Sequence, residues 1–375
     1  MRILHLAYED PKQPGSGGGS VRTLEVNRRL SRRHEITAVV AGYPGARERV
    51  EDGIRWIPIG PSRGGKVDRL SYFALAGPHV LKHRHDLVIE DFGAPFSIAC
   101  SPLFTRHPVI GSVQWLFAAE MRRKYRLPFD LVERFGLRFY DRFIVVSEWL
   151  GQQIRERRPT AEVVVIPNGI EDLAYSVGAA TPSHLLFVGR LDMQQKGLDM
   201  LVSITARAAS ILGSRMPKLV VVGDGPDRQI LEKHAENLGV LPLIKFHGRV
   251  EGIRKYQLMA NAFAVLMPSR FETFGMVAAE SQAAGAPVVA FDIGPLAAVV
   301  GEGGACLVKP FDVDAFAANV AELVTNSKWA NQLRASGKRW ARQYNWGEIA
   351  ARQEEYYVQV LQRHKDGVQL ERGRL

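Results

Sequence analysis

The chain has 375 residues, of which 46% are hydrophobic and 23% charged, so it can bury the cores of two domains and is not disordered. No apolar run approaches the roughly 20 residues of a membrane span, and the first strand is too brief for a signal peptide. The net charge of +10 is spread along the chain without a single cluster, so it is weak evidence for a nucleic-acid, membrane or nucleotide partner. Cys100 and Cys306 lie among apolar neighbours, and we expect buried free thiols in a reducing compartment.

Apolar runs that predict β-strands alternate with helical stretches in the first half of the chain. The predicted strands are Arg2–Ala7, Glu35–Ala41, Asp86–Glu90, Val109–Gln114, Arg142–Val146 and Val163–Ile166. The predicted helices are Val21–Arg33, Leu70–His83, Leu131–Tyr140 and Glu148–Glu156. This alternation is typical of a doubly wound parallel sheet, whose ligands bind at the carboxyl ends of the strands.

The second half repeats this plan. Its predicted strands are His184–Val188, Lys218–Val222, Ile244–His247, Ala264–Pro268, Pro287–Phe291 and Ala305–Val308. Its predicted helices are Leu198–Leu212, Asp227–Leu238, Lys255–Ala260, Val277–Ala284, Val313–Val324 and Asn331–Tyr344. Turn residues at 167–172 and a polar linker at 175–182 predict domains at 1–172 and 173–345, and an amphipathic helix at Trp346–Leu361 begins a final segment, 346–375.

The most informative segment, Pro268–Phe291, carries two carboxylates, Glu272 and Glu280, eight positions apart. It reads as strand, polar loop, helix, glycine stop and strand, with the helix beginning near Phe274–Met276. The free amides and the positive dipole end of that helix suit a diphosphate. Eight residues of helix would separate the carboxylates by about 12 Å, too far for an acid/base pair on one bond but suitable for one extended ligand. A core helix with two unrelated glutamates is the alternative, and the flanking residues argue against it.

Two cations follow the first strand of the second half. Arg190 and Lys196, six residues apart on a loop that leads into a helix, can converge on one diphosphate. Solvated surface charge is the alternative, and the surrounding Gly-Arg-Leu-x4-Lys-Gly pattern argues against it.

A glycine-rich loop at 14–20 follows the first strand, and its glycines allow close approach to a phosphate. The loop has neither Gly-x-Gly-x-x-Gly in register nor Gly-Lys-Ser/Thr, so neither a nicotinamide-dependent enzyme nor a P-loop enzyme is indicated. A mobile glycine loop without a ligand is an equal alternative.

Together these motifs resemble those of retaining glycosyltransferases with the GT-B fold, glycosyltransferase family 4 in particular. The matching positions occur in the family's order and spacing, and they are Gly18-Gly19, Gly189-Arg190 with Lys196, Gly223–Pro226 and Pro268–Pro287. The resemblance implies two Rossmann-like domains facing a central cleft. The N-terminal domain would bind the acceptor, the C-terminal domain would bind the nucleotide sugar, and the last helix would cross back to the N-terminal domain.

The resemblance further implies transfer of a hexosyl group from a nucleotide-diphosphate sugar, UDP favoured, to an acceptor hydroxyl with retention, without cofactor or metal. The implied catalytic residues are Arg190, Lys196 and Glu272. Glu272 would hold sugar hydroxyls and Glu280 the ribose diol. The implied donor-binding residues are Gly18, Gly19, Arg249, Val250, Thr273, Phe274, Gly275, Met276 and Glu280. The turn at 223–226 matches the family's Gly-x-Gly-Pro signature, and we interpret it as structural, a turn that shapes the cleft. The sequence shows no Asp-x-Asp metal motif at a strand end.

The first half departs from the family at Gln114, where many members carry a histidine near the reacting sugar; glutamine cannot exchange protons near pH 7. Glu90 and Asp91 end a strand, and as ionised acceptor-binding groups they would favour a hydroxyl-rich or cationic acceptor. Helix capping is the equal alternative. Ala298 stands where members often have a glutamate. The basic-aromatic segment 121–129 indicates a solvated or acceptor-facing surface, with weak membrane-surface contact as the alternative.

The resemblance leaves the acceptor open among small molecules, saccharides and lipid-linked sugars, and it implies no nucleic-acid partner. The rival functions are a sugar-nucleotide epimerase or phosphorylase on the same fold, a non-catalytic sugar-nucleotide-binding protein and a nucleic-acid binder. We expect a cytoplasmic location, with the inner membrane face as a peripheral alternative.

Overall fold

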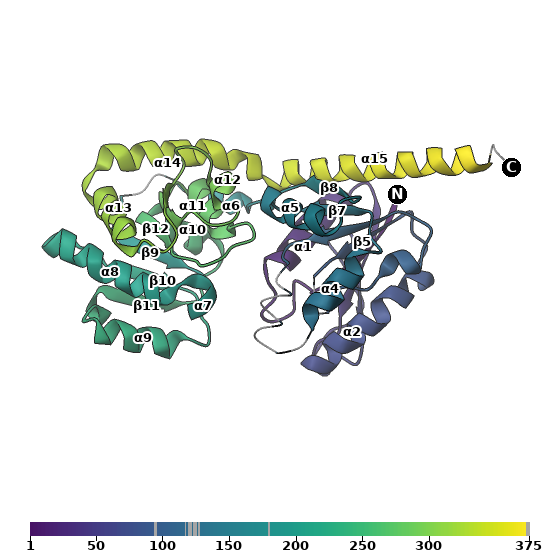
Figure 1. The fold of residues 1–375 in the computed structure, drawn as a ribbon, viewed down its shortest axis with the longest axis horizontal. Helices are drawn as coiled ribbons and strands as arrows, with labels where there is room; N and C mark the ends of the chain where they lie inside the picture. Colours follow the sequence, from purple (N-terminus) through teal and green to yellow (C-terminus); the bar gives the residue numbers. More distant parts are fainter. Residues whose placement is uncertain are drawn as a thin grey trace. The chain divides into compact units, whose positions relative to one another are not determined.

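The computed structural model describes residues 1–93, 96–116, 118, 122, 126, 128–178 and 181–372. The chain divides into two compact units, one formed by Met1–Asn168 with Trp346–Leu375 and the other by Gly169–Asn345. Each unit contains one mainly parallel sheet with helices, so the predicted α/β class is confirmed (Figure 1). Among the described residues, no helix combines the length and apolar character needed to cross a bilayer. Cys306 is buried and Cys100 half-buried, and both are free thiols.

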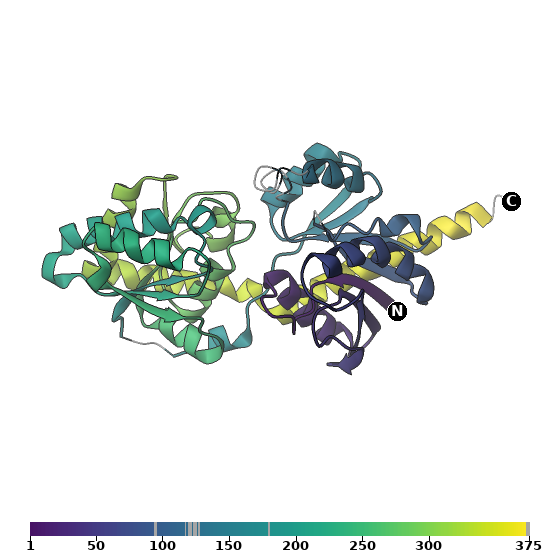
Figure 2. The ribbon, with the colours of Figure 1, turned by 90° about the horizontal axis from the view of Figure 1, so that it is seen from below.

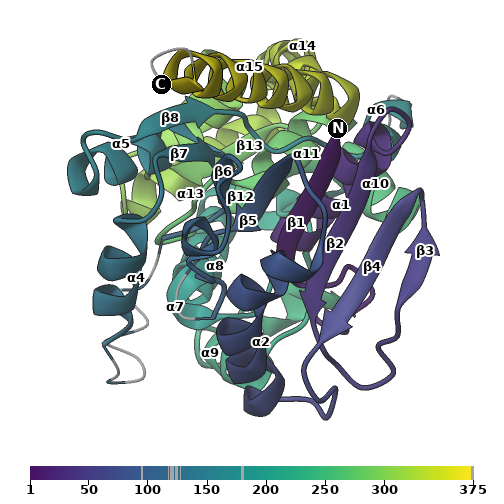
Figure 3. The same cartoon turned by 90° about the vertical axis from the view of Figure 1, so that its right-hand side faces the viewer.

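The first unit is built on an eight-stranded sheet in the order β3-β4-β2-β1-β5-β6-β7-β8, parallel except for β3 (Figure 3). Its strands are β1 (Arg2–Tyr8), β2 (Glu35–Ala41), β3 (Arg49–Glu51), β4 (Ile54–Ile59), β5 (Leu87–Asp91), β6 (Val109–Val113), β7 (Arg142–Val145) and β8 (Glu162–Val165). Its α-helices include α1 (Gly18–Leu30), α2 (Lys66–His79), α4 (Phe129–Leu137), α5 (Glu148–Arg157) and α15 (Trp346–Arg372).

The hairpin of β3 and β4 is absent from the sequence prediction. Asp52 and Gly53 connect its strands with φ values of 53° and 74°, the pattern of a type I′ turn. An Asp-Gly pair is therefore the signal that could have revealed the hairpin. Arg49 of β3 holds the buried carboxylate of Asp10 by two hydrogen bonds of 2.7 and 2.8 Å. The hairpin thus braces the segment that precedes the glycine-rich loop.

Helix α15 packs on α1 and completes the core of the first unit (Figure 1, Figure 2). Arg22 of α1 is buried and donates hydrogen bonds to the carbonyl of Ile166 and to Gln353 of α15. Burial lowers the pKa of Arg22 to about 10. The apolar side chains that α15 contributes at helical spacing are Trp346, Ile349, Tyr357 and Val360.

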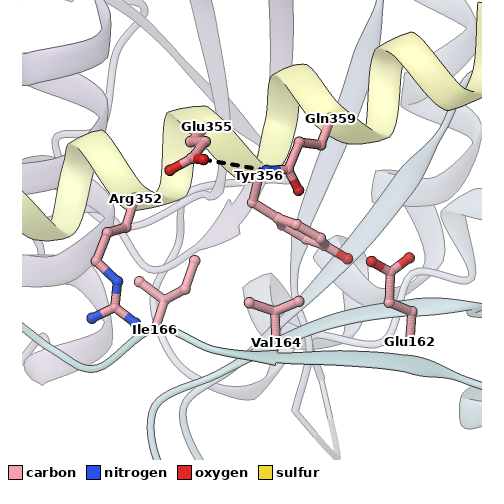
Figure 4. A pocket seen from close by; sticks show the side chains of 7 residues that line it. All are labelled: Glu162, Val164, Ile166, Arg352, Glu355, Tyr356 and Gln359. Carbon is pink, nitrogen blue, oxygen red and sulfur yellow. Dashed lines mark hydrogen bonds between the residues drawn. The ribbon is translucent and has the colours of Figure 1, made fainter.

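A pocket lies between α15 and β8, one of the two edge strands of this sheet (Figure 4). Its lining residues are Glu162, Val164, Ile166, Arg352, Glu355, Tyr356 and Gln359. Because α15 lies beside this edge, it shields the strand from pairing with another chain. None of the predicted site residues lines this pocket.

The second unit is built on a six-stranded parallel sheet in the order β11-β10-β9-β12-β13-β14. Its strands are β9 (His184–Val188), β10 (Leu219–Val222), β11 (Ile244–Gly248), β12 (Ala262–Met267), β13 (Val288–Phe291) and β14 (Cys306–Val308). Its α-helices are α6 (Asp172–Ser176), α7 (Met193–Lys196), α8 (Leu198–Leu212), α9 (Arg228–Asn237), α10 (Gly252–Ala260), α11 (Met276–Ala284), α12 (Leu296–Val300), α13 (Val313–Thr325) and α14 (Ser327–Ala341). All six predicted strands are confirmed.

The unit boundary follows Asn168, whereas the sequence placed it after Asp172 with a linker beyond it. The difference arises because α6 packs on α10 and α11 of the second unit. Glu171, directly before α6, also accepts a hydrogen bond of 3.0 Å from the hydroxyl of Tyr256.

Alternate residues of the second sheet serve two separate cores. Val289 and Phe291 of β13 point to the core formed with α8 and α13, whereas Val288 and Ala290 point to the core formed with α11 and α12. A strand buried on both faces is nearly all apolar, which explains the continuous Val-Val-Ala-Phe run.

Candidate functional site

The predicted catalytic residues of the second unit follow β9 and β12, which are adjacent strands. Arg190 and Lys196 come after β9, and Glu272 comes after β12. Nζ of Lys196 lies 2.6 Å from Oε1 of Glu272, and Oγ of Ser269 donates to the same oxygen at 2.9 Å. Both charged side chains are largely buried, with 16% and 10% of their surfaces exposed. The structure therefore brings Lys196 and Glu272 together as an ion pair at the carboxyl edge of the sheet.

Arg190 lies on the same loop with an exposed side chain, and among the described residues its guanidinium has no hydrogen-bond or ion-pair partner. The Gly-x-Gly-Pro turn at residues 223–226 packs against the backbone of this loop. A β-carbon on Gly223 would lie 1.8 Å from the carbonyl oxygen of Gly189, and one on Gly225 would lie 2.4 Å from that of Leu191. Only glycines permit this backbone contact, which supports the structural interpretation of the turn.

The Lys196 loop and the Glu272 loop are fastened to each other. Gly197 has a φ of 62°, and a β-carbon there would lie 2.0 Å from the carbonyl oxygen of Pro268. Arg270 pairs with both carboxylate oxygens of Asp199 at 2.9 and 2.6 Å, and its backbone N–H donates to Gln195. The sequence prediction did not include Arg270, because a lone arginine between two motifs carries no pattern of its own.

Helix α11 begins at Met276, four residues after Glu272, so the spacing expected for eight residues of helix does not apply to the two carboxylates. Gly275 precedes the helix with a φ of 94°, and a β-carbon there would lie 2.4 Å from Cδ2 of Leu296. The first turn contains no acidic residue, so nothing in it offsets the positive helix end. Phe274 is buried against Tyr344, with ring centroids 5.5 Å apart, so its side chain anchors the loop.

Glu280 lies inside α11 and is 8% exposed. Its Oε1 accepts a hydrogen bond of 2.9 Å from Nζ of Lys255 and a longer one of 3.5 Å from the hydroxyl of Tyr256. Burial raises the pKa of Glu280, and the positive charge of Lys255 opposes this effect. The sequence prediction missed Lys255 and Tyr256, because a lysine in the first turn of a helix resembles ordinary surface charge.

The remaining predicted donor residues of the second unit are Arg249, Val250 and Thr273. Arg249 follows β11 and is exposed, and its Nε pairs with Oε1 of Glu251 at 2.6 Å. Val250 and Thr273 are half-buried.

In the first unit, the predicted residues lie at the carboxyl ends of three adjacent strands, β1, β5 and β6. Gly18 and Gly19 form the first turn of α1, which follows β1. A β-carbon on Gly19 would lie 3.6 Å from Cγ of Gln114, which follows β6. Asp91 ends β5, between them in the sheet order. The structure thus groups Gly19, Asp91 and Gln114 at one edge of the first sheet.

Glu90 requires a correction, because its carboxylate faces the interior. It is 1% exposed, and its two oxygens accept hydrogen bonds from the backbone of Ala99 at 2.6 Å and from the backbone and hydroxyl of Ser101 at 3.2 and 2.5 Å. Burial raises the pKa of Glu90. Asp91, the next residue in the strand, points to the opposite face of the sheet. Glu90 therefore braces a loop, and of this predicted pair only Asp91 is open to a ligand.

Asp91 belongs to a polar network below α1. Its Oδ2 accepts a hydrogen bond of 3.0 Å from Thr23, and its Oδ1 lies 3.2 Å from Nε2 of His5. Nδ2 of Asn27 lies 2.8 Å from Nδ1 of His5, so Nδ1 accepts and Nε2–H donates to Asp91. The carboxylate retains 17% exposure. His5 was not predicted, because a histidine inside the first strand resembles a core residue.

Part of the predicted surface lies outside the described residues. This applies to residues 94–95 of the loop after Asp91 and to residues 121, 123–125 and 127 of the basic-aromatic segment. Within that segment Arg122 is described, and it pairs with Asp130 at 2.6 Å. Over the described ranges, no group of three or more histidine, cysteine or acidic side chains is arranged to hold a metal ion.

Comparisons with known proteins match both units. Residues 16–172 match the model of Glycosyltransferase Family 4, and residues 182–326 match that of Glycosyl transferases group 1. Glycogen synthase of Mycobacterium tuberculosis is 29% identical over 236 residues, covering 60% of this chain and 56% of that protein. D-inositol 3-phosphate glycosyltransferase of Streptomyces griseus is 31% identical over 192 residues, covering 48% and 40%. The matched segments thus span about half the length of these relatives.

Solved structures match over nearly the whole chain. Sucrose-phosphate synthase of Thermosynechococcus elongatus has a TM-score of 0.80 at 21% identity, covering 96% of this chain and 98% of that one. HepE of Anabaena in complex with UDP has a TM-score of 0.72 at 18% identity, covering 96% and 100%. These likenesses define the GT-B class of fold. The two family models, matched over residues 16–172 and 182–326, show that the chain belongs to the family 4 and group 1 glycosyltransferases.

Proposed function

We propose that this protein transfers a hexosyl group from a nucleotide-diphosphate sugar, with UDP favoured, to an acceptor hydroxyl with retention of anomeric configuration. The observation that carries the proposal is the Lys196–Glu272 pair beside the uncompensated positive end of α11. A cation and a helix end suit a diphosphate, and a carboxylate beside them suits the hydroxyls of an attached sugar. Solved structures with this fold include HepE of Anabaena in complex with UDP, and with UDP and glucose.

In the proposed reaction, the bond between the anomeric carbon and the diphosphate oxygen breaks as the acceptor oxygen bonds to that carbon on the same face. The acceptor proton passes to the departing phosphate oxygen. Negative charge grows on the diphosphate during this step, so Arg190 and Lys196 stabilise the transition state more than the ground state. Glu272 would hold sugar hydroxyls, Glu280 the ribose diol, and the amides of Gly275 and Met276 the phosphates. Arg190, Lys196 and the amides at the start of α11 would supply the positive charge without a divalent ion.

The first unit is the proposed acceptor-binding part, through Asp91 and Gln114, with Gly18 and Gly19 facing the donor diphosphate. Gln114 can donate to and accept from a hydroxyl, and Asp91 is a partly exposed carboxylate. Hydroxyl-rich or cationic acceptors fit these groups better than anionic ones. The class of acceptor, whether small molecule, saccharide or lipid-linked sugar, is to be found by screening.

The first experiment is a thermal-shift panel of UDP-, GDP-, ADP- and TDP-sugars, with and without magnesium, on the wild type, Lys196→Ala and Lys233→Ala. Lys233 is an exposed lysine of α9 and serves as the matched control. We expect one nucleotide family to raise the melting temperature of the wild type and the control, independently of magnesium. No shift with any of these ligands would overturn the proposal.

With an acceptor in hand, Lys196→Ala should lower kcat by about a hundredfold or more, because it removes a charge that acts in the transition state. Lys233→Ala should leave kcat unchanged. The anomeric configuration of the product, read by NMR, tests retention directly. An altered sugar nucleotide released without any acceptor would instead identify an epimerase.

A further inference from the structure

The two carboxylate oxygens of Glu280 differ in their hydrogen-bond partners. Oε1 accepts the bonds from Lys255 and Tyr256, while no hydrogen bond from the described residues reaches Oε2. The side chain is 11% exposed even though the residue lies inside a helix. One oxygen is therefore fixed by the protein, and the other is left for a hydroxyl donor from a ligand.

Lys255 is the strong partner of this carboxylate. Its Nζ lies 2.9 Å from Oε1 and 4.4 Å from the centre of the Tyr256 ring, so the ammonium is held between α10 and α11. Tyr256 contributes less, because its hydroxyl is 3.5 Å from Oε1 and only 3.0 Å from Oε2 of Glu171. Its single proton therefore serves Glu171, and Lys255 is the close positive group of the cluster.

The charges around Glu280 would otherwise favour its neutral form. Burial raises the pKa of Glu280 and Glu171 raises it further, whereas Lys255 and the Tyr256 hydroxyl act in the opposite direction. A neutral carboxylic acid is a poorer acceptor for a sugar hydroxyl than a carboxylate. Without Lys255, Glu280 would need a higher pH to reach the ionised form.

We propose that Lys255 is the positioning residue that makes Glu280 select a ribonucleotide over its 2′-deoxy counterpart. The inference rests on the proposed function, in which Glu280 meets the ribose of the donor. Lys255 acts by holding Oε1 and the negative charge, so that Oε2 faces the ribose diol. It touches no reacting atom, and its effect should appear in nucleotide affinity and selectivity.

The test uses titration calorimetry of the full chain with UDP, GDP and ADP and with their 2′-deoxy counterparts. The variants are Lys255→Met, Lys255→Arg, Glu280→Gln and the surface control Lys233→Met. A hydrogen bond to a charged group gives the wild type an expected preference for the ribonucleotide of roughly tenfold or more. Lys255→Met and Glu280→Gln should bring this preference to within about threefold. Lys255→Arg should restore most of it, and Lys233→Met should retain it in full.

A second readout is the pH dependence of affinity between pH 6.5 and 8.5. In Lys255→Met, ribonucleotide affinity should rise with pH more than in the wild type, since loss of the lysine charge leaves the pKa of Glu280 higher. Glu280→Gln should show no such recovery. An ion pair that served stability alone would change the melting temperature but not the selectivity or its pH profile. Should Lys255→Met fail to fold, Lys255→Gln provides the same test, because it removes the charge and keeps a donor.

The outcomes separate the two proposals. If the wild type binds no nucleoside diphosphate, the proposed function fails and this inference fails with it. If the wild type binds and prefers the ribonucleotide, but folded Lys255→Met or Lys255→Gln keeps that preference, only the role of Lys255 is overturned. The role of Lys255 is supported if these variants lose the preference for the ribonucleotide and Lys255→Arg restores it.

Discussion

At the scale of single residues, burial separates side chains that the sequence presents as equivalent. Glu90 and Asp91 are adjacent carboxylates at one strand end, yet the first is enclosed by the backbone of Ala99 and Ser101 and the second is partly exposed. Strand alternation predicts that they face opposite sides, but not which side is covered. The cover is a loop nine to eleven residues further along the chain, and its path follows from tertiary packing.

The contact of Lys255 with Glu280 also follows from tertiary packing and could not be predicted from the sequence. Motif spacing indicated Glu280, but its partner lies on another helix, 25 positions earlier. Charge alone could not single out this lysine among the 49 lysine and arginine residues of the chain. Lys196 and Glu272 were both predicted as site residues from their surrounding motifs, whereas their direct contact, across 76 positions, was not.

A residue-scale prediction concerns Asp86. Hydrogen bonds from Arg2, at 2.6 Å from the side chain and 2.7 Å from the backbone, lower the pKa of Asp86 from 3.8 to about 2. A lowered carboxyl pKa stabilises the fold above the unfolded value, and this contribution is lost as pH falls through the folded value. Asp86→Asn should therefore lower the free energy of unfolding by about 1 kcal/mol at pH 7, after allowance for solvent screening.

The difference between wild type and Asp86→Asn should shrink towards zero as the pH falls to 2. Urea unfolding at pH 7, 4 and 2.5 measures it. Asp314→Asn is the control, since the side chain of Asp314 is 77% exposed. A difference that stays constant with pH would contradict the assignment of this stability to the Arg2–Asp86 pair.

At the scale of elements, most strands were predictable because strands covered on both faces form continuous apolar runs with turn residues between them. The β3–β4 hairpin was missed because β3 has only three residues and shows no such run. Helix α6 was missed because five residues are too few to show a periodic pattern. The two loops that carry Lys196 and Glu272 were predicted separately, and their mutual fastening was not.

Substitution of Gly197 tests whether its close contact with Pro268 holds the Lys196 loop against the Glu272 loop. Gly197→Ala places a β-carbon 2.0 Å from the Pro268 carbonyl oxygen, whereas Gly239→Ala has a similar φ, 68° against 62°, and open space. Both substitutions incur the left-handed backbone cost of about 1 kcal/mol. Gly197→Ala should cost about 2 kcal/mol more, because the backbone must move apart. It should also weaken nucleotide binding, since Lys196 moves with the loop.

Urea unfolding and calorimetry with UDP compare the two alanine variants. Equal stability and equal affinity would show that the close approach at Gly197 is not needed to hold the site. A loss of affinity in Gly239→Ala as large as in Gly197→Ala would indicate a general effect of left-handed strain.

At the scale of the whole molecule, the last helix is part of the first unit although it is furthest from it in sequence. The buried guanidinium of Arg22 donates hydrogen bonds to the carbonyl of Ile166 and to Gln353, which lies 331 positions beyond Arg22 in the sequence. The amphipathic pattern of Trp346–Leu361 predicted a helix that packs on something, and only the family resemblance indicated what. Periodicity identifies the buried face of a helix but not its partner.

Truncation of the chain tests whether α15 is needed for the stability of the first unit. A chain that ends at Asn345 loses Trp346, Ile349 and Tyr357, each at most 1% exposed, and should destabilise the first unit by more than about 5 kcal/mol. A chain that ends at Leu361 keeps these side chains and serves as the control. Hydrogen exchange should show lost protection in residues 1–168 and retained protection in 169–345. Retained protection in both ranges would contradict the prediction.

The Lys196–Glu272 contact has a consequence for the release of product from the proposed site. If Lys196 binds the donor as proposed, an incoming diphosphate would compete with an internal carboxylate for the same ammonium, and part of the attraction for the donor would be cancelled before binding. In the proposed reaction, Glu272 would lose the sugar hydroxyls once the sugar has been transferred, and it could then pair with Lys196 again. The ion pair of the free protein would then act as a built-in competitor of the nucleoside diphosphate product, limiting product inhibition and hastening each new round of transfer.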